Sequence, residues 1–179
     1  WAELDSPQDL FHFKFGTKAE TLKKLENKLV HSKVLEQVNF TVKEFEDDSD
    51  LIINEIQSKI QSKKIIVRSS ALNEDTHNSS MAGNYESILN INTSDKTLIR
   101  DAIILVIDSY LKGGQGKVFD NQILVQPQLE GVQMSGVAFS KDLETSAPYY
   151  TINYDLSNKT DSITSGIGSG EQHTYIHSK

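Results

Sequence analysis

The sequence contains no cysteine, which excludes disulfide bonds, thiolate zinc sites and cysteine nucleophiles together. Any metal ion must therefore be held by oxygen or histidine ligands. Long apolar runs are also missing. No segment approaches the roughly 20 residues that a transmembrane helix needs, and no basic start followed by an apolar stretch marks a signal peptide. We therefore expect a cytoplasmic protein with no membrane partner.

Basic residues are outnumbered, and arginine is nearly absent. The chain has 18 lysines and arginines against 25 aspartates and glutamates, and its net charge of −7 without a dense basic stretch argues against nucleic acid as a partner. Its two arginines are Arg68 and Arg100. A guanidinium stays charged and can bind phosphate through two parallel hydrogen bonds. The use of arginine at position 68 therefore predicts a phosphate ligand there.

The chain length of 179 residues is enough for one domain, or for one domain with a smaller lobe. Segments of helical and strand periodicity are mixed without an internal repeat, so we expect an α+β fold. The first residue is Trp1 rather than methionine, and we expect the chain to be a fragment of a longer protein.

Residues 65–89 form the stretch around which the rest of the chain is organised. The apolar run at 65–67 predicts a buried strand that delivers Arg68 into a polar loop rich in serine, glycine and alanine. Backbone N–H groups of such a loop can form a concavity for an anion, and Gly83 has no side chain to block it. A solvated loop beside a structural salt bridge is the alternative interpretation.

A helix is predicted near the start of the chain. Apolar residues recur at helical spacing over residues 17–30, with Thr17 or Gly16 as the cap, so Lys18 lies in the first turn. A cation is mildly unfavourable at a helix N-terminus. Lys18 is therefore either a solvated surface residue or a residue that meets a nearby anion.

Strands and helices follow along the rest of the chain. Periodicity and turn residues predict strands at 38–45, 85–91, 123–127, 136–139, 149–154 and 161–165, and helices at 47–64 and 94–111. The acidic cluster at 47–50 fits the start of a helix better than a metal site. Pro127 cannot donate to a strand ladder, so we expect a hinge there with backbone groups free for a ligand. Asp155 and Asp161 bracket a turn, either as two surface carboxylates or as two magnesium ligands.

Several of these stretches resemble one family. VRSSALNED and SSMAGNYESIL are similar to the nucleotide-binding domain of phosphoenolpyruvate synthase and pyruvate phosphate dikinase. ILVQPQLEGVQMSGVAFSKD, FGTKAETLKKL and DSITSG resemble further segments of that domain, in the same order along the chain. The resemblance implies an ATP-grasp-like fold in which residues 1–112 form a first lobe with the phosphate-binding loop. Residues 113–179 would then form the hinge and second lobe of one ATP-binding domain spanning 1–179.

The resemblance also implies roles for single residues. Lys18 and Arg68 match the catalytic pair that contacts the ATP phosphates. Nucleotide-binding positions correspond to Gly83 in the phosphate loop, to Ser87 and to Gln126, which leads into an adenine hinge at 127–129.

The resemblance also implies a metal position. Asp161 takes the place of a glutamate that holds magnesium, and its side chain is one methylene shorter. Asp155 is a candidate for a second ligand, and Gln172 for a downstream glutamine. The implied cofactors are ATP and Mg²⁺.

In the family, phosphate passes from Mg-ATP to a histidine on a separate domain and then to a small-molecule acceptor. None of the five histidines here lies in a TSHA-like segment, so we expect that domain in another part of a longer protein. TKAETL and YYTINYD are more similar to an L-glutamine kinase-like branch, so the acceptor is expected to be pyruvate or an amide such as L-glutamine. Two alternatives are a non-catalytic nucleotide-binding regulatory module, which Asp161 favours, and a plain interaction domain.

Overall fold

The computed structural model of the chain describes residues 16–71, 75–76, 79–80, 85–112, 118–142, 145–156 and 172–178. The chain divides into two compact units, Trp1–Gln128 and Leu129–Lys179. Helices and antiparallel strands are mixed in the described residues, so the expected α+β class is confirmed. No helix within these ranges is long and apolar enough to cross a bilayer.

A four-stranded antiparallel sheet forms the centre of the first unit. Its strand order is β1 (Val38–Thr41), β6 (Gln122–Pro127), β2 (Lys64–Ser70) and β5 (Ser87–Asn92). A separate two-stranded sheet pairs β3 (Asp75–Thr76) with β4 (Ser79–Ser80). β2 pairs with β6 on one side and with β5 on the other. β6, which lies after the expected lobe boundary at residue 112, is therefore an inner strand of this first sheet.

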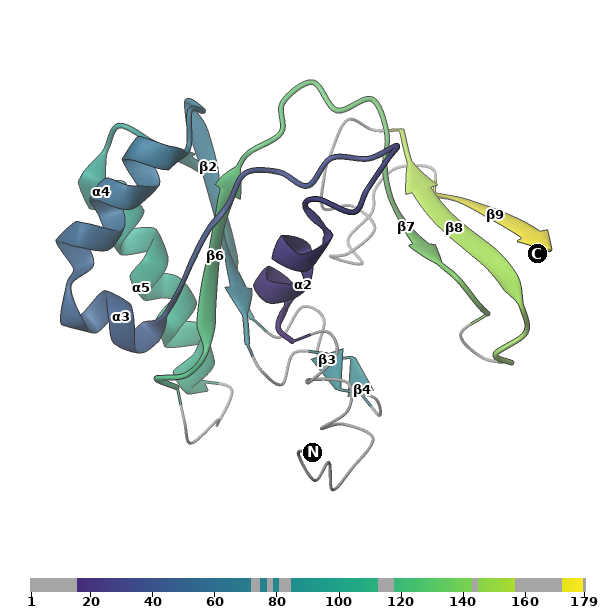
Figure 1. Ribbon diagram of the computed structural model, residues 1–179, viewed down its shortest axis with the longest axis horizontal. Coiled ribbons are helices and arrows are strands. Elements are labelled where there is room, and N and C mark those ends of the chain that lie inside the picture. Colours follow the sequence, from purple (N-terminus) through teal and green to yellow (C-terminus); the bar gives the residue numbers. More distant parts are fainter. Residues whose placement is uncertain are drawn as a thin grey trace. The chain divides into compact units, whose positions relative to one another are not determined.

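Helices cover the two faces of the sheet unequally. α3 (Val42–Asp47), α4 (Ser49–Lys59) and α5 (Lys96–Lys112) lie on one side, and α2 (Lys18–Leu25) lies on the other (Figure 1). The core fills the side with three helices. Its fully buried members include Ile65, Val67, Ile123 and Val125 from the sheet, Ile53 and Ile56 from α4, and Ile99, Ile103 and Val106 from α5.

Aspartate caps begin the two longer helices. The Asp48 carboxylate accepts a hydrogen bond from the backbone N–H of Leu51 (2.9 Å) at the start of α4. Asp95 does the same for the N–H groups of Thr97 and Leu98 (2.9 and 3.1 Å) at the start of α5. The acidic cluster at 47–50 therefore caps a helix, as expected.

The strand predicted at 38–45 is wrong in its second half. β1 ends at Thr41, where Thr41 and Glu44 form a capping box: Thr41 Oγ1 accepts from Glu44 N (3.1 Å), and Glu44 Oε2 accepts from Thr41 N (2.7 Å). Val42 and Phe45 are then three residues apart on one face of α3, and both are buried. A spacing of three residues places both side chains on one face of a helix, whereas a strand would send them to opposite faces.

The helix predicted over 17–30 is shorter than expected. A capping box of Thr17 and Glu20 starts α2, but the helix ends at Leu25, and Val30 is 86% exposed. Without apolar surface to bury, the later side chains do not stabilise further turns. Gly16 is needed at the start because its φ is +74° and a Cβ there would lie 1.9 Å from Glu20 Oε2.

The second unit contains a three-stranded antiparallel sheet. Its order is β7 (Ser135–Phe139), β8 (Tyr149–Asp155) and β9 (Gln172–Ser178). The first two strands were expected, whereas β9 was missed because it follows a glycine-rich stretch without a clear signal of its own. The strand predicted at 161–165 lies outside the described residues.

Loss of the β1–α3 cap gives a test of this fold. We expect Thr41→Ala to lower the free energy of unfolding by about 1 kcal/mol, because the Glu44 N–H loses its side-chain acceptor. Urea unfolding of both chains measures the difference. Thr97→Ala on the exposed surface of α5 is the matched control and should change stability by less than about 0.5 kcal/mol. Equal effects of the two substitutions would contradict the capping role.

Candidate functional site

The face of the sheet that carries α2 presents polar side chains. Successive side chains of a strand point to opposite faces. Since Ile65 and Val67 of β2 lie in the core, Arg68 and Ser70 point to the α2 side. By the same alternation, Gln126 of β6 lies on the α2 side. We call this surface the polar face.

Strand register brings three of the predicted site residues onto the polar face. Arg68 lies opposite Ser87 of β5 on one side and opposite Leu124 of β6 on the other. Residues directly opposite each other share a face, so Arg68 and Ser87 are neighbours. Gln126 is two residues beyond Leu124 and is only 5% exposed, whereas the Ser87 side chain is exposed.

Lys18 joins the same face through the anchoring of α2. The N–H of Ala19, the residue after Lys18, donates to Ser70 Oγ (3.0 Å). Ser70 is two residues beyond Arg68 on the same strand, a separation of roughly 7 Å along β2. The structure thus places the first turn of α2, which contains Lys18, at the end of β2 that carries Arg68, although the two residues are 50 positions apart in the sequence.

Gln122 gives α2 a second attachment. Thr17 Oγ1 donates to Gln122 Oε1 (2.7 Å), and Gln122 Nε2 donates to Glu20 Oε1 (3.0 Å). Gln122 lies directly opposite Ser70 in the sheet. The first turn of α2 is therefore held across the ends of two paired strands.

Tyr110 of α5 ties these strand ends to the core. Its side chain is fully buried, its hydroxyl accepts from Ser70 N (3.0 Å), and it donates to Gln122 O (2.5 Å). Sequence reasoning missed Ser70, Gln122 and Tyr110 as supports of the site. The two serines after the β2 apolar run were a signal, but the partners of Ser70 come from three distant segments.

The backbone at the start of α2 is already occupied. Ala19 N donates to Ser70 Oγ and Glu20 N donates to Thr17 Oγ1. The Glu20 carboxylate also places negative charge in the first turn, where it complements the helix dipole. An anion at this end of α2 would therefore be bound through the Lys18 side chain rather than through these backbone N–H groups.

Arg68 differs sharply from the other arginine of the chain. Arg100 pairs with Asp50 (2.8 Å) and contacts the Ser49 hydroxyl, linking α5 to the start of α4. The Arg68 Nε is buried and has no hydrogen-bond partner, and no ion pair of Arg68 occurs among the described residues. A half-buried arginine with an unbonded Nε suits an external anion such as phosphate.

The hinge expected at Pro127 is only partly free. β6 ends at Pro127, but the next N–H, that of Gln128, donates to Lys64 O (2.9 Å). The Gln128 side chain also bonds Asn90, accepting from its N–H (2.5 Å) and donating to its Oδ1 (3.0 Å). The expectation of a free backbone at this position is therefore wrong for the Gln128 N–H.

The second unit holds the remaining described candidates. Asp155 at the end of β8 is 1% exposed, so the reading of it as a surface carboxylate is wrong. It lies opposite Gln172 of β9 and Ser135 of β7, which brings the two weaker candidates Asp155 and Gln172 together. Gly83 and Asp161 lie outside the described residues. Within the described ranges, no three histidine or acidic side chains are grouped to hold a metal ion.

Comparison with known proteins gives one family. The chain matches the family described as the pyruvate phosphate dikinase AMP/ATP-binding domain over residues 15–114 of its 179. No curated protein matches the chain. The matched segment contains Lys18, Arg68, Gly83 and Ser87, and it ends before Gln126 and Asp161. Because the match spans more than half of the sequence, the chain belongs to the pyruvate phosphate dikinase AMP/ATP-binding domain family.

Proposed function

We propose that the polar face of the first unit binds the phosphates of ATP through Arg68 and Lys18. The observation that carries the proposal is the half-buried Arg68 side chain, whose buried Nε has no hydrogen-bond partner among the described residues. It lies on the face to which α2 brings Lys18, in a domain of an AMP/ATP-binding family. A triphosphate supplies the several negative oxygens that two such cations can bind.

The energetics favour an external partner for Arg68. Arg68 is half-buried, and its buried Nε is left without a hydrogen bond among the described residues, which costs free energy that an external acceptor would recover. Strand pairing on both sides holds the Arg68 backbone in position, so little backbone reorganisation is needed when an anion arrives. Preorganised cations of this kind stabilise transferring phosphoryl groups most effectively.

The remaining contacts complete the proposed ATP site. The exposed Ser87 hydroxyl next to Arg68 is a further donor for a phosphate oxygen. Gln126, buried on the same face, is the candidate for the base end of the nucleotide. We assign Gly83 to the phosphate loop and Asp161 to Mg²⁺, which would neutralise phosphate charge.

The proposed reaction needs another domain. Phosphate would pass from Mg-ATP to a histidine on a separate domain of a longer, ATP-grasp-like phosphotransferase, and then to pyruvate or an amide such as L-glutamine. The alternative is a regulatory module that binds nucleotide without transfer. The shorter Asp161 side chain favours this alternative. A regulatory module would bind ATP, but labelled phosphate from ATP would not reach the histidine domain.

Replacing each arginine in turn by methionine separates effects on Mg-ATP binding from effects on the free energy of unfolding. We expect Arg68→Met to raise the Kd for Mg-ATP at least about tenfold, the loss expected for a charge-assisted hydrogen bond. The same substitution should leave the free energy of unfolding unchanged or slightly higher, because it removes a buried Nε that has no hydrogen-bond partner and breaks no ion pair among the described residues. Calorimetric titration and urea unfolding measure the two quantities.

Arg100→Met is the matched control for that experiment. It removes the partly exposed pair with Asp50 and should lower stability by about 0–1 kcal/mol while leaving the Kd for Mg-ATP unchanged. The proposal fails if Arg68→Met binds Mg-ATP as tightly as the unchanged chain, or if both substitutions weaken binding equally.

Ser70 should act on the site through Lys18. Ser70→Ala removes the acceptor for Ala19 N, so the first turn of α2 is less firmly held and we expect the Kd for Mg-ATP to rise several-fold. In a double-mutant cycle, Ser70→Ala should have little further effect once Lys18→Ala is present, with a coupling of about 1 kcal/mol.

A buried serine elsewhere gives the control for Ser70. Ser109 of α5 is also buried. Its Oγ donates to Val106 O (2.6 Å) and accepts from Glu86 N (3.3 Å), and it has no bond to α2. Ser109→Ala should therefore show no coupling to Lys18→Ala. Coupling of the same size for both serines would mean that the effect is general loss of stability rather than positioning of Lys18.

A further inference from the structure

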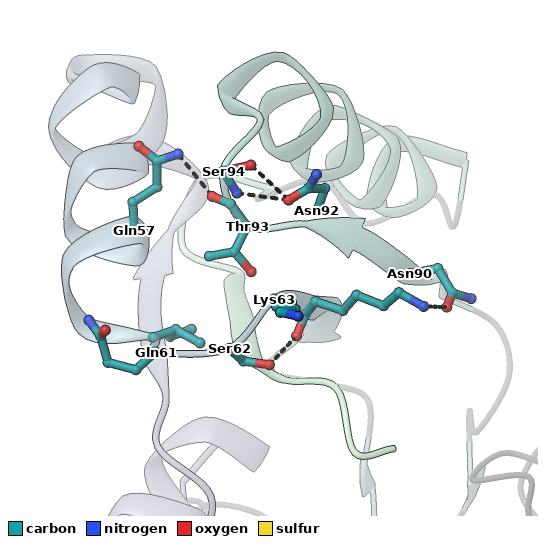
Figure 2. A pocket seen from close by; sticks show the side chains of 10 residues that line it. Gln57, Gln61, Ser62, Lys63, Asn90, Asn92, Thr93 and Ser94 are labelled. Carbon is teal, nitrogen blue, oxygen red and sulfur yellow. Dashed lines mark hydrogen bonds between the residues drawn. The ribbon is translucent and has the colours of Figure 1, made fainter. Parts of the chain in front are cut away.

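A cavity of about 560 Å³ lies at the end of β2 remote from Arg68. It is formed by the end of α4, the segment at 60–64 that leads into β2, the end of β5 and the turn before α5 (Figure 2). Its volume is within the range of about 300–1,000 Å³ typical of small-molecule sites. Lys64 in its wall is four residues before Arg68, roughly 13 Å away along the strand, so the cavity is separate from the proposed ATP site.

The charge of the cavity is opposite to that of the chain. Lys63 and Lys64 line it, and no aspartate or glutamate does, although the net charge of the chain is −7. The amides of Gln57, Asn90 and Asn92 add neutral hydrogen-bonding groups. A second cavity of about 320 Å³ in the same unit has two lysines and three glutamates in its wall. Of these two cavities, the larger one is therefore suited to an anion.

Thr93 supplies an unsatisfied polar group in the same cavity. Its residue is 7% exposed, and its Oγ1 is buried with no hydrogen-bond partner. The backbone of Thr93 is fully engaged: its N–H donates to Lys63 O (3.1 Å), and its carbonyl accepts from Gln57 Nε2 (2.9 Å). Figure 2 shows its hydroxyl pointing toward Ser62 and Lys63. Leaving a buried hydroxyl unbonded costs free energy that a ligand oxygen would recover.

We propose that this cavity binds a small oxyanion-bearing molecule, with Lys63 providing the charge and the Thr93 hydroxyl a hydrogen bond. Lys64 Nζ is already directed to Asn90 Oδ1 (3.5 Å), so it adds charge to the wall and fixes one amide. Phosphate and carboxylate groups share the chemistry that such a site recognises. The volume leaves room for a ligand larger than the bare ion, and the site is independent of ATP binding.

An NMR titration of the chain tests the proposal. Inorganic phosphate and citrate are added in separate arms, with sodium chloride at matched ionic strength as the blank. We expect saturable shifts of the backbone amides at 61–64 and 93–94 in at least one arm, and the tighter arm identifies the anion. Shifts that grow linearly without saturation, or that match the chloride blank, would overturn the proposal as they indicate an adventitious ion only.

Two variants assign the binding to named groups. Lys63→Ala and Thr93→Val should each weaken binding of the preferred anion about tenfold. Thr93→Val removes an unpartnered hydroxyl and nearly conserves shape, so its melting temperature should be unchanged or higher. Lys23→Ala is the matched control, because Lys23 lines the smaller cavity and should leave the Kd unchanged.

Other outcomes of the variant series contradict the site. If Lys23→Ala and Lys63→Ala weaken anion binding equally, the loss of affinity reflects the net charge of the chain rather than a site in the cavity. If the NMR shifts are confined to α2 and to the end of β2 that carries Arg68, and are lost in Arg68→Ala, the anion binds at the proposed ATP site instead. A titration in the Arg68→Ala background separates the two sites, since binding in the cavity should persist there.

Discussion

The pairing of β2 between β6 and β5 is the constraint on which the rest of the first unit depends. With neighbours on both edges, its register is fixed, and its alternate side chains must go to opposite faces. Ile65 and Val67 join the core, while Arg68 and Ser70 face α2. Tyr110 then crosses from the core helices to the strand ends and bonds backbone groups of both strands. The same strand pairing therefore places apolar side chains in the core on one face and Arg68 and Ser70 toward α2 on the other.

The two arginines show how differently one residue type can serve a fold. Arg100 links two helices through Asp50 and Ser49, in a partly exposed pair of the kind that contributes little stability. Arg68 has a buried Nε without a partner. Among the described residues, no ion pair of this half-buried side chain supports the fold. In a domain of an AMP/ATP-binding family, this contrast with Arg100 supports the binding role that we propose for Arg68.

Local signals in the sequence were sufficient for much of the fold. The aspartate caps of α4 and α5 and the apolar run of β2 could be read directly, because each depends on residues within a few positions. Thr41 shows the limit of periodicity, since its capping box with Glu44 overrode an alternating pattern. β9 was missed because a strand without a strong pattern of its own is defined by its partner, β8. The candidate site was harder to predict than the fold. Arg68 could be selected by its residue type. The placement of α2, which contains Lys18, depends on the hydrogen bond from Ala19 N to Ser70 Oγ, between residues 51 positions apart.

The unpaired state of Arg68 has a consequence for how this domain would change over evolutionary time. Ser70, Tyr110 and Gln122 bond one another and α2, so selection for folding alone would preserve them. Selection for folding gives no such protection to Arg68. If Arg68 binds an anion as we propose, drift in a lineage that no longer used the anion would replace this arginine early and leave the surrounding hydrogen bonds intact. Among descendants of such a domain, the residue at position 68 would therefore be a better record of retained chemistry than the preservation of the fold around it.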